Sequence, residues 1–170
     1  MNIFVLHEDP VKAAQDQCDK HVVKMVLESA QMLSTAHRIL DGDNVIDESF
    51  YKIAHKGHPC TKWVMESVAN YQWLYDHFIG LCDEYTYRYG KTHLSDTKFR
   101  DILLFSPNNI PIEERTPFAL AMSAFPQFID YNDPVTSYRR YYGTKADNFN
   151  LLWTKREIPD WYFREYTGAF

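Results

Sequence analysis

The chain has 170 residues, a net charge of −5 and 27 aromatic side chains: 12 Tyr, 11 Phe and 4 Trp. A chain of this length can bury a sizeable core, so we expect one domain over residues 1–170. The acidic balance argues against a protein that stays bound to the duplex DNA backbone, because such proteins usually carry a basic surplus. Three cysteines without a repeated spacing disfavour a disulfide framework. With no apparent signal peptide or membrane span, we expect a cytoplasmic protein.

The N-terminal third predicts one short and one long helix. Asp9-Pro10 is a capping residue followed by a proline that suits the first helical position, and it opens a short helical segment over 11–17. The long helix that follows is expected to end near Asp41-Gly42-Asp43, before a loop over 43–60. Only Ile3-Phe4-Val5-Leu6 resembles a strand, and it has no obvious partner.

The rest of the chain predicts further helices. Apolar residues at helical spacing indicate a second long helix over 61–89, ended by Gly90. Ser95 can cap a shorter helix through Leu104, and Thr116-Pro117 and Asp133-Pro134 repeat the pattern of a cap before proline. The last of these helices should end at Gly143. We therefore predict an all-α, single-domain bundle with two long helices and shorter C-terminal helices.

A narrow polar line marks the first long helix. His21 and Glu28 are seven residues apart and so share a face, with Lys24 between them and Asp19 at the start. One interpretation is an ordinary solvent-exposed face on which Lys24 and Glu28 form an i, i+4 ion pair. The other is a functional site, because a buried carboxylate beside Lys and His can act as an acid or base. His37 lies on the apolar side, where it must be hydrogen-bonded or functional.

Two further clusters carry possible chemistry. His55, His58 and Cys60 are competent zinc ligands, but their spacing matches no standard site, so a loop bearing histidines is the default and we predict no metal and no cofactor. The segment 138–143 interleaves two arginines with three tyrosines, which can contact phosphates and stack on bases, or can serve as solvated charges and core anchors.

Two of these segments resemble the pyrimidine-dimer DNA glycosylases of phages (the endonuclease V family), which are small all-α enzymes. In that family an Asp-x-His precedes the catalytic Glu by the spacing seen here from Asp19 and His21 to Glu28. An aromatic-x-basic-Tyr-Tyr-Gly segment near the family's C-terminus helps to hold DNA, and it is similar to 138–143 here. The chain also resembles uncharacterised proteins of large tailed phages.

The resemblance implies a mechanism in which an amine attacks the sugar C1′, the base departs and a Schiff base forms, while a carboxylate shuttles protons. By position, Glu28 is that carboxylate and His21 its neighbour. The family's amine belongs to a small residue exposed by removal of the initiator Met, whereas Asn2 here disfavours that removal. Lys24, one turn from Glu28, is then the substitute nucleophile, provided that desolvation favours its neutral form.

The sequence therefore predicts a phage-encoded protein of a host cell's cytosol that acts on a nucleic acid or nucleotide by N-glycosidic cleavage or base modification. A single-stranded, modified or small substrate is favoured over undamaged duplex. The predicted catalytic residues are Glu28, His21 and Lys24, and the predicted phosphate or nucleic-acid contacts are Arg38, Arg139, Arg140, Tyr141 and Tyr142. The alternatives are a non-catalytic nucleotide binder or a blocker of a host defence protein on the same scaffold, and a metal-dependent hydrolase.

Overall fold

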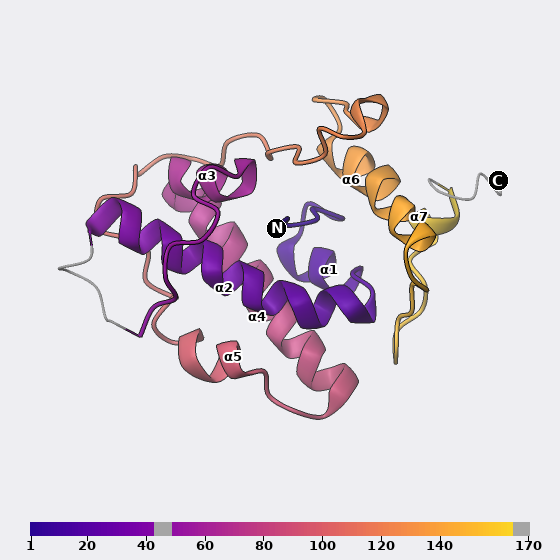
Figure 1. Cartoon of the computed structure of the whole chain (residues 1–170), viewed down its shortest axis with the longest axis horizontal. Coiled ribbons are helices and arrows are strands. Elements are labelled where there is room, and N and C mark those ends of the chain that lie inside the picture. Colours follow the sequence, from indigo (N-terminus) through magenta and orange to yellow (C-terminus); the bar gives the residue numbers. More distant parts are fainter. Residues whose placement is uncertain (43–48, 165–170) are drawn as a thin grey trace.

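The computed structural model describes residues 1–42 and 49–164, and over these residues it contains helices and irregular segments but no strand. The all-α prediction is confirmed for these residues. The elements, shown in Figure 1, are α1 (Pro10–Gln15), α2 (Asp19–Asp41), α3 (Pro59–Glu66), α4 (Val68–Tyr89), α5 (Leu94–Phe99), η1 (Pro126–Phe128), α6 (Pro134–Gly143), η2 (Thr144–Asp147) and α7 (Asp160–Tyr162).

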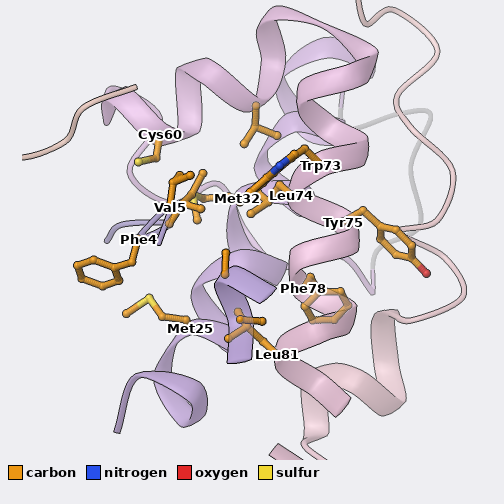
Figure 2. Close-up of a cluster of buried hydrophobic side chains, with 14 of the residues drawn as sticks. Phe4, Val5, Met25, Met32, Cys60, Trp73, Leu74, Tyr75, Phe78 and Leu81 are labelled. Carbon is orange, nitrogen blue, oxygen red and sulfur yellow. The ribbon is translucent and has the colours of Figure 1, made fainter. Parts of the chain in front are cut away.

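The core forms where α2 and α4 cross, with α1 packed against α4 (Figure 1). Met32 of α2 and Leu74, Phe78 and Leu81 of α4 are all buried in this contact (Figure 2). Gly80 allows α1 to approach closely, because a Cβ at this position would lie 3.0 Å from the Ala14 Cβ and 3.2 Å from the Val11 Cα. The two long helices thus form the frame on which the N-terminal segment rests.

Residues 3–6, the only strand candidate, form a buried irregular segment instead, so the strand interpretation is wrong. Ile3, Val5 and Leu6 are at most 2 % exposed, and Phe4 has a positive φ of 57°. Side chains take the hydrogen bonds that a neighbouring strand would take. Asn2 Oδ1 accepts from the backbone of residues 3 and 4, Gln17 Nε2 donates to Ile3 O, and Arg139 Nε donates to Leu6 O.

The predicted helix over 61–89 is in fact two helices, α3 and α4, separated at Ser67. Ser67 is extended (φ −156°, ψ 157°), and its hydroxyl caps α4 by accepting from Asn70 N. Val68 N donates to Pro111 O rather than into a continuing helix. The expected end at Gly90 is confirmed, since Gly90 has φ 67° and its N–H donates to Thr86 O.

Two of the other predicted helix starts are corrected. No helix begins at Thr116-Pro117, because Thr116 is held from outside its own segment: its N–H donates to Asn70 Oδ1 and its hydroxyl to Glu66 Oε2. His93 rather than Ser95 caps α5, and this helix ends at Phe99, not at Leu104.

The caps at Asp9 and Asp133 are confirmed, since each carboxylate accepts from the backbone N–H three residues on. The predicted loop over 43–60 is shortened by α3, which begins at Pro59, and its first part, 43–48, lies outside the described residues. None of the helices in the described ranges is long and apolar enough to cross a membrane.

Candidate active site

A cavity of about 450 Å³ lies beside the N-terminal residues, against α2. Its volume is in the range of small-ligand pockets, about 300–1,000 Å³. The N-terminus, α2, the start of α3 and the segment after α6 all contribute side chains to it. The lining residues are Met1, Asn2, Phe4, His21, Lys24, Met25, Glu28, His58, Ala121, Tyr141, Lys145, Asn148 and Phe149.

Glu28 places its carboxylate between two amines at this cavity. The α-amino nitrogen of Met1 lies 3.8 Å from Oε2, and Lys24 Nζ lies 3.5 Å from Oε1. Asn2 N also donates to Oε2, at 3.3 Å. Glu28 is 9 % exposed, while the apolar Val23 and Leu27 on the same helix are 39 % and 38 % exposed. Glu28 is therefore not on a solvent-exposed face, although the i, i+4 ion pair with Lys24 that this interpretation predicted is present.

The first two residues are fixed by side-chain packing, and this positions the α-amine. The side chain of Met1 is 2 % exposed, and its Sδ accepts from the Thr61 hydroxyl at 3.7 Å. Asn2 is buried and donates from Nδ2 to Ala121 O at 2.9 Å. The Lys24 side chain, by contrast, is 61 % exposed. Of the two amines, the α-amine is therefore the better fixed in position, because the side chain of its residue is buried.

His21 is also buried at the cavity, stacked on Phe4 with a centroid distance of 4.7 Å. Its Nδ1 lies 2.8 Å from the Tyr142 hydroxyl, which accepts from Cys18 N and also lies 3.2 Å from Cys18 Sγ. The Tyr142 hydroxyl donates to Cys18 Sγ, and its contact with Nδ1 of His21 fixes the orientation of the ring. Burial, and after it nearby Lys145, lower the pKa of His21 to about 3. His21 is thus a neutral imidazole rather than a proton-transfer group near neutral pH.

The opposite wall of the cavity combines aromatic rings with a cation. Lys145 Nζ donates to the Tyr141 hydroxyl at 3.0 Å and lies 4.2 Å from that ring's centroid. Tyr141 stacks on Phe4, and Phe149 meets His21 edge-on at 5.6 Å. The cavity is therefore lined by three cationic groups, those of Met1, Lys24 and Lys145, and by one carboxylate, that of Glu28. The surplus of positive charge and the aromatic rings favour an anionic ligand with a flat part.

The structure brings the three predicted catalytic residues together, and Asp19 has a different role. Asp19 accepts from Arg88 Nη1 at 3.0 Å and from Thr154 N at 2.8 Å. The Arg88 side chain is fully buried and also bonds Glu84. Asp19 therefore ties the start of α2 to the end of α4 and to the C-terminal segment. It does not line the cavity.

The predicted phosphate contacts are spread over the molecule, and Tyr141 is the one that lines the cavity. Tyr142 is fully buried beneath His21, so a direct contact between this ring and a nucleic acid is incompatible with the structure. Arg38 donates to the carbonyls of Phe50 and Tyr51, and Arg139 lies in a separate hollow with Asp16 and Trp161.

Arg140 is exposed outside the cavity, and its contact with phosphate stays a prediction. His37 is a structural residue: its Nε2 lies 2.9 Å from the Tyr71 hydroxyl, and its ring stacks on Phe50.

The proposed zinc ligands do not converge. Cys60 is buried and contacts Asn2 and Tyr138, and burial raises the pKa of its thiol to about 11. Within residues 1–42 and 49–164, no three His, Cys, Asp or Glu side chains are arranged to hold a metal ion. His58 belongs to the cavity instead, facing the same space as Glu28.

Sequence reasoning missed several cavity residues. Phe4, Asn148 and Phe149 carried no local signal, since single aromatic or amide residues are common everywhere. Lys145 follows the recognised segment 138–143 by two positions and could have been added to it. The Met1 amine could not be placed without knowing the path of residues 1–6.

Comparison with known families places the chain in one of them. The family model described as pyrimidine dimer DNA glycosylase matches residues 1–97. The matched region contains Glu28, His21, Lys24 and His58, whereas the aromatic wall from Tyr141 to Phe149 lies beyond it. Comparisons with curated proteins and with solved structures find no match. The match covers more than half of the chain, and the protein therefore belongs to the pyrimidine dimer DNA glycosylase family.

Proposed function

We propose that this protein cleaves N-glycosidic bonds in DNA through an amine nucleophile, with Glu28 as the proton-transfer group. The observation that carries the proposal is the pair of amines on the two oxygens of Glu28, at 3.8 Å and 3.5 Å, inside a cavity of ligand size. A carboxylate beside an attacking amine can accept its proton and return it to the sugar once the groups close to hydrogen-bond distance.

The α-amine of Met1 is the better nucleophile of the two. As a class, α-amino groups are less basic than lysine side chains, which makes them the readier nucleophiles. Its residue is also held by the buried side chains of Met1 and Asn2, while Lys24 is largely exposed. Lys24 is then a charge partner of Glu28. This assignment requires Met1 to be the first residue of the mature protein.

The reaction would begin when the neutral amine attacks C1′. The new N–C1′ bond forms as the glycosidic bond breaks, and the bonding pair leaves with the base, which takes a proton from water. Glu28 accepts a proton from the attached nitrogen and returns it to the ring oxygen O4′ as the sugar opens to the Schiff base. The neutral ring of His21 lines the cavity and can hydrogen-bond to an atom of the sugar or base.

The cavity geometry supports a nucleotide displaced from a stack, or one in a single strand, rather than undamaged duplex. The reacting groups lie within a pocket, and a base inside a duplex cannot reach such a site without leaving the helix. The chain's net charge of −5 further disfavours tight binding to duplex backbone.

Borohydride trapping tests the proposal. The protein would be incubated with single-stranded DNA carrying an abasic site, and with DNA carrying a pyrimidine dimer, in the presence of sodium borohydride. We expect a covalent adduct that peptide mass spectrometry maps to the residue 1 amine, and we expect the Lys24→Arg variant to form it as well. An adduct on Lys24 would reverse the choice of nucleophile. The absence of any adduct with either DNA would overturn the amine mechanism and favour the non-catalytic binder.

A further inference from the structure

His58 is a cavity residue whose side chain also caps a helix. Its Nδ1 accepts from Cys60 N at 3.1 Å and thereby caps α3. A nitrogen that accepts a backbone N–H carries no proton, so in the neutral ring the proton lies on Nε2. The cap therefore fixes both the orientation of the ring and its tautomer.

The Nε2–H of His58 has no partner within the part of the chain that the structure describes. The buried side-chain nitrogen and oxygen atoms without a partner there are Gln17 Oε1 and Ser34 Oγ, so His58 Nε2 reaches solvent. The ring lines the same cavity as Glu28 and the Met1 amine. Among the described residues, the cavity thus holds an oriented N–H donor without a protein acceptor.

The surroundings of His58 keep it a neutral donor and select an anionic acceptor. Burial, and after it the Met1 ammonium group, lower the pKa of His58 below its ordinary value. The cavity around it carries the cations Met1, Lys24 and Lys145 against the single carboxylate of Glu28. In a nucleotide, the anionic group rich in acceptors is the phosphate, and it complements both the positive surplus and a fixed N–H.

We propose that His58 binds a phosphate oxygen next to the reacting sugar through its Nε2–H, and that it is a substrate-binding residue rather than a metal ligand. The inference rests on the proposed function, because it takes the ligand to be a nucleotide of DNA. It gives the cavity a second neutral imidazole beside that of His21.

The chain offers a matched control for this residue. His93 caps α5 in the same way, accepting from Ser95 N at 3.0 Å through Nδ1, and it does not line the cavity. Asparagine is itself a good N-cap. His58→Asn and His93→Asn therefore both preserve a cap, while only the first removes an imidazole Nε2–H from the cavity; the shorter asparagine does not extend to that position.

Binding would be measured by fluorescence anisotropy on the full chain with two labelled single-stranded oligonucleotides. Both carry a tetrahydrofuran analogue of an abasic site, which lacks a C1′ leaving group. In the second, the phosphates on either side of the analogue are replaced by neutral methylphosphonates. We expect His58→Asn to weaken binding of the first probe about tenfold or more, as for a lost hydrogen bond to a charged group. The difference between wild type and His58→Asn should shrink to less than about twofold on the second probe.

The outcomes separate the two proposals. If the wild type binds the phosphate probe and His58→Asn binds it equally well, the role of His58 is wrong while the proposed function stands. The same conclusion follows if His58→Asn loses affinity equally for both probes, or if His93→Asn weakens binding as much. If the wild type binds neither probe, the proposed function fails, and the role of His58 fails with it.

Discussion

The α-amino nitrogen of Met1 and the Oε2 atom of Glu28 lie 3.8 Å apart, although they are separated by 27 positions in the chain. The contact exists because residues 2–6 form a buried segment rather than a free tail. Asn2 and Gln17 hold the backbone of this segment, and Glu28 meets it from the third turn of α2. The start of the chain is therefore part of the cavity wall.

Replacing Glu28 with Gln should abolish Schiff-base formation and leave binding intact. The amide keeps the shape of the side chain and can still accept from Asn2 N, but it cannot take a proton. We expect the trapping rate on abasic DNA to fall at least about 100-fold, with binding of the tetrahydrofuran probe within about twofold of wild type. Glu113→Gln makes the same charge change at an exposed position and should behave as wild type. Full trapping activity in Glu28→Gln would remove Glu28 from the mechanism.

Most of α1, α2 and α6 could be predicted from the sequence because their signals are local. A capping side-chain oxygen followed by proline defines a helix start without reference to the rest of the molecule, as at Asp9 and Asp133. The same pattern failed at Thr116, because Asn70 and Glu66 from another part of the chain take its hydrogen bonds. Ser67 interrupts the predicted long helix for a similar reason, since the next N–H donates to the carbonyl of Pro111.

The cavity residues that the sequence predicted come from two local patterns. His21, Lys24 and Glu28 share a face of α2, and Tyr141 belongs to the segment 138–143. His58 and Lys145 reach the cavity from elements far away in the chain, and no local pattern connects them to Glu28. Tyr142 shows the converse, because a residue type typical of nucleic-acid contacts is used to orient His21 from the core.

We predict that Asp19, the first residue of the Asp-x-His motif, has a structural and not a catalytic role. Asp19→Ala removes an acceptor of the buried Arg88 guanidinium and two hydrogen bonds to Thr154. We expect the free energy of unfolding to fall by about 2–4 kcal/mol, because a buried charge loses a partner. Urea denaturation measures this loss, with Asp101→Ala at an exposed position as the control. At a temperature where the variant is folded, it should still form the borohydride adduct. A stable variant without the adduct would instead place Asp19 in the chemistry.

The pH dependence of stability should report the burial of neutral His21. Its pKa is lowered to about 3 in the folded protein from an ordinary value of 6.5, so the unfolded chain binds more protons between these values. This contribution to stability is present above about pH 6.5 and is lost as the pH falls. Between pH 7 and pH 5, wild type should lose about 2 kcal/mol more than His21→Asn. Urea denaturation at the two pH values measures the difference. If the free energy of unfolding falls equally in the two proteins, His21 is not a neutral, buried residue.

The last prediction concerns Lys145, the cation of the aromatic wall. Its Nζ is held by the Tyr141 hydroxyl at 3.0 Å, at the cavity, where it can pair with a phosphate of a bound strand. We expect Lys145→Gln to weaken binding of the single-stranded tetrahydrofuran probe about fivefold at low salt. The slope of the logarithm of the association constant against the logarithm of salt concentration should become shallower by about 0.7, as for the loss of one phosphate contact on a single strand. Lys98→Gln makes the same change in net charge on α5, away from the cavity, and should alter neither quantity appreciably. If the two variants behave alike, Lys145 acts only through the overall charge of the protein and does not contact the strand.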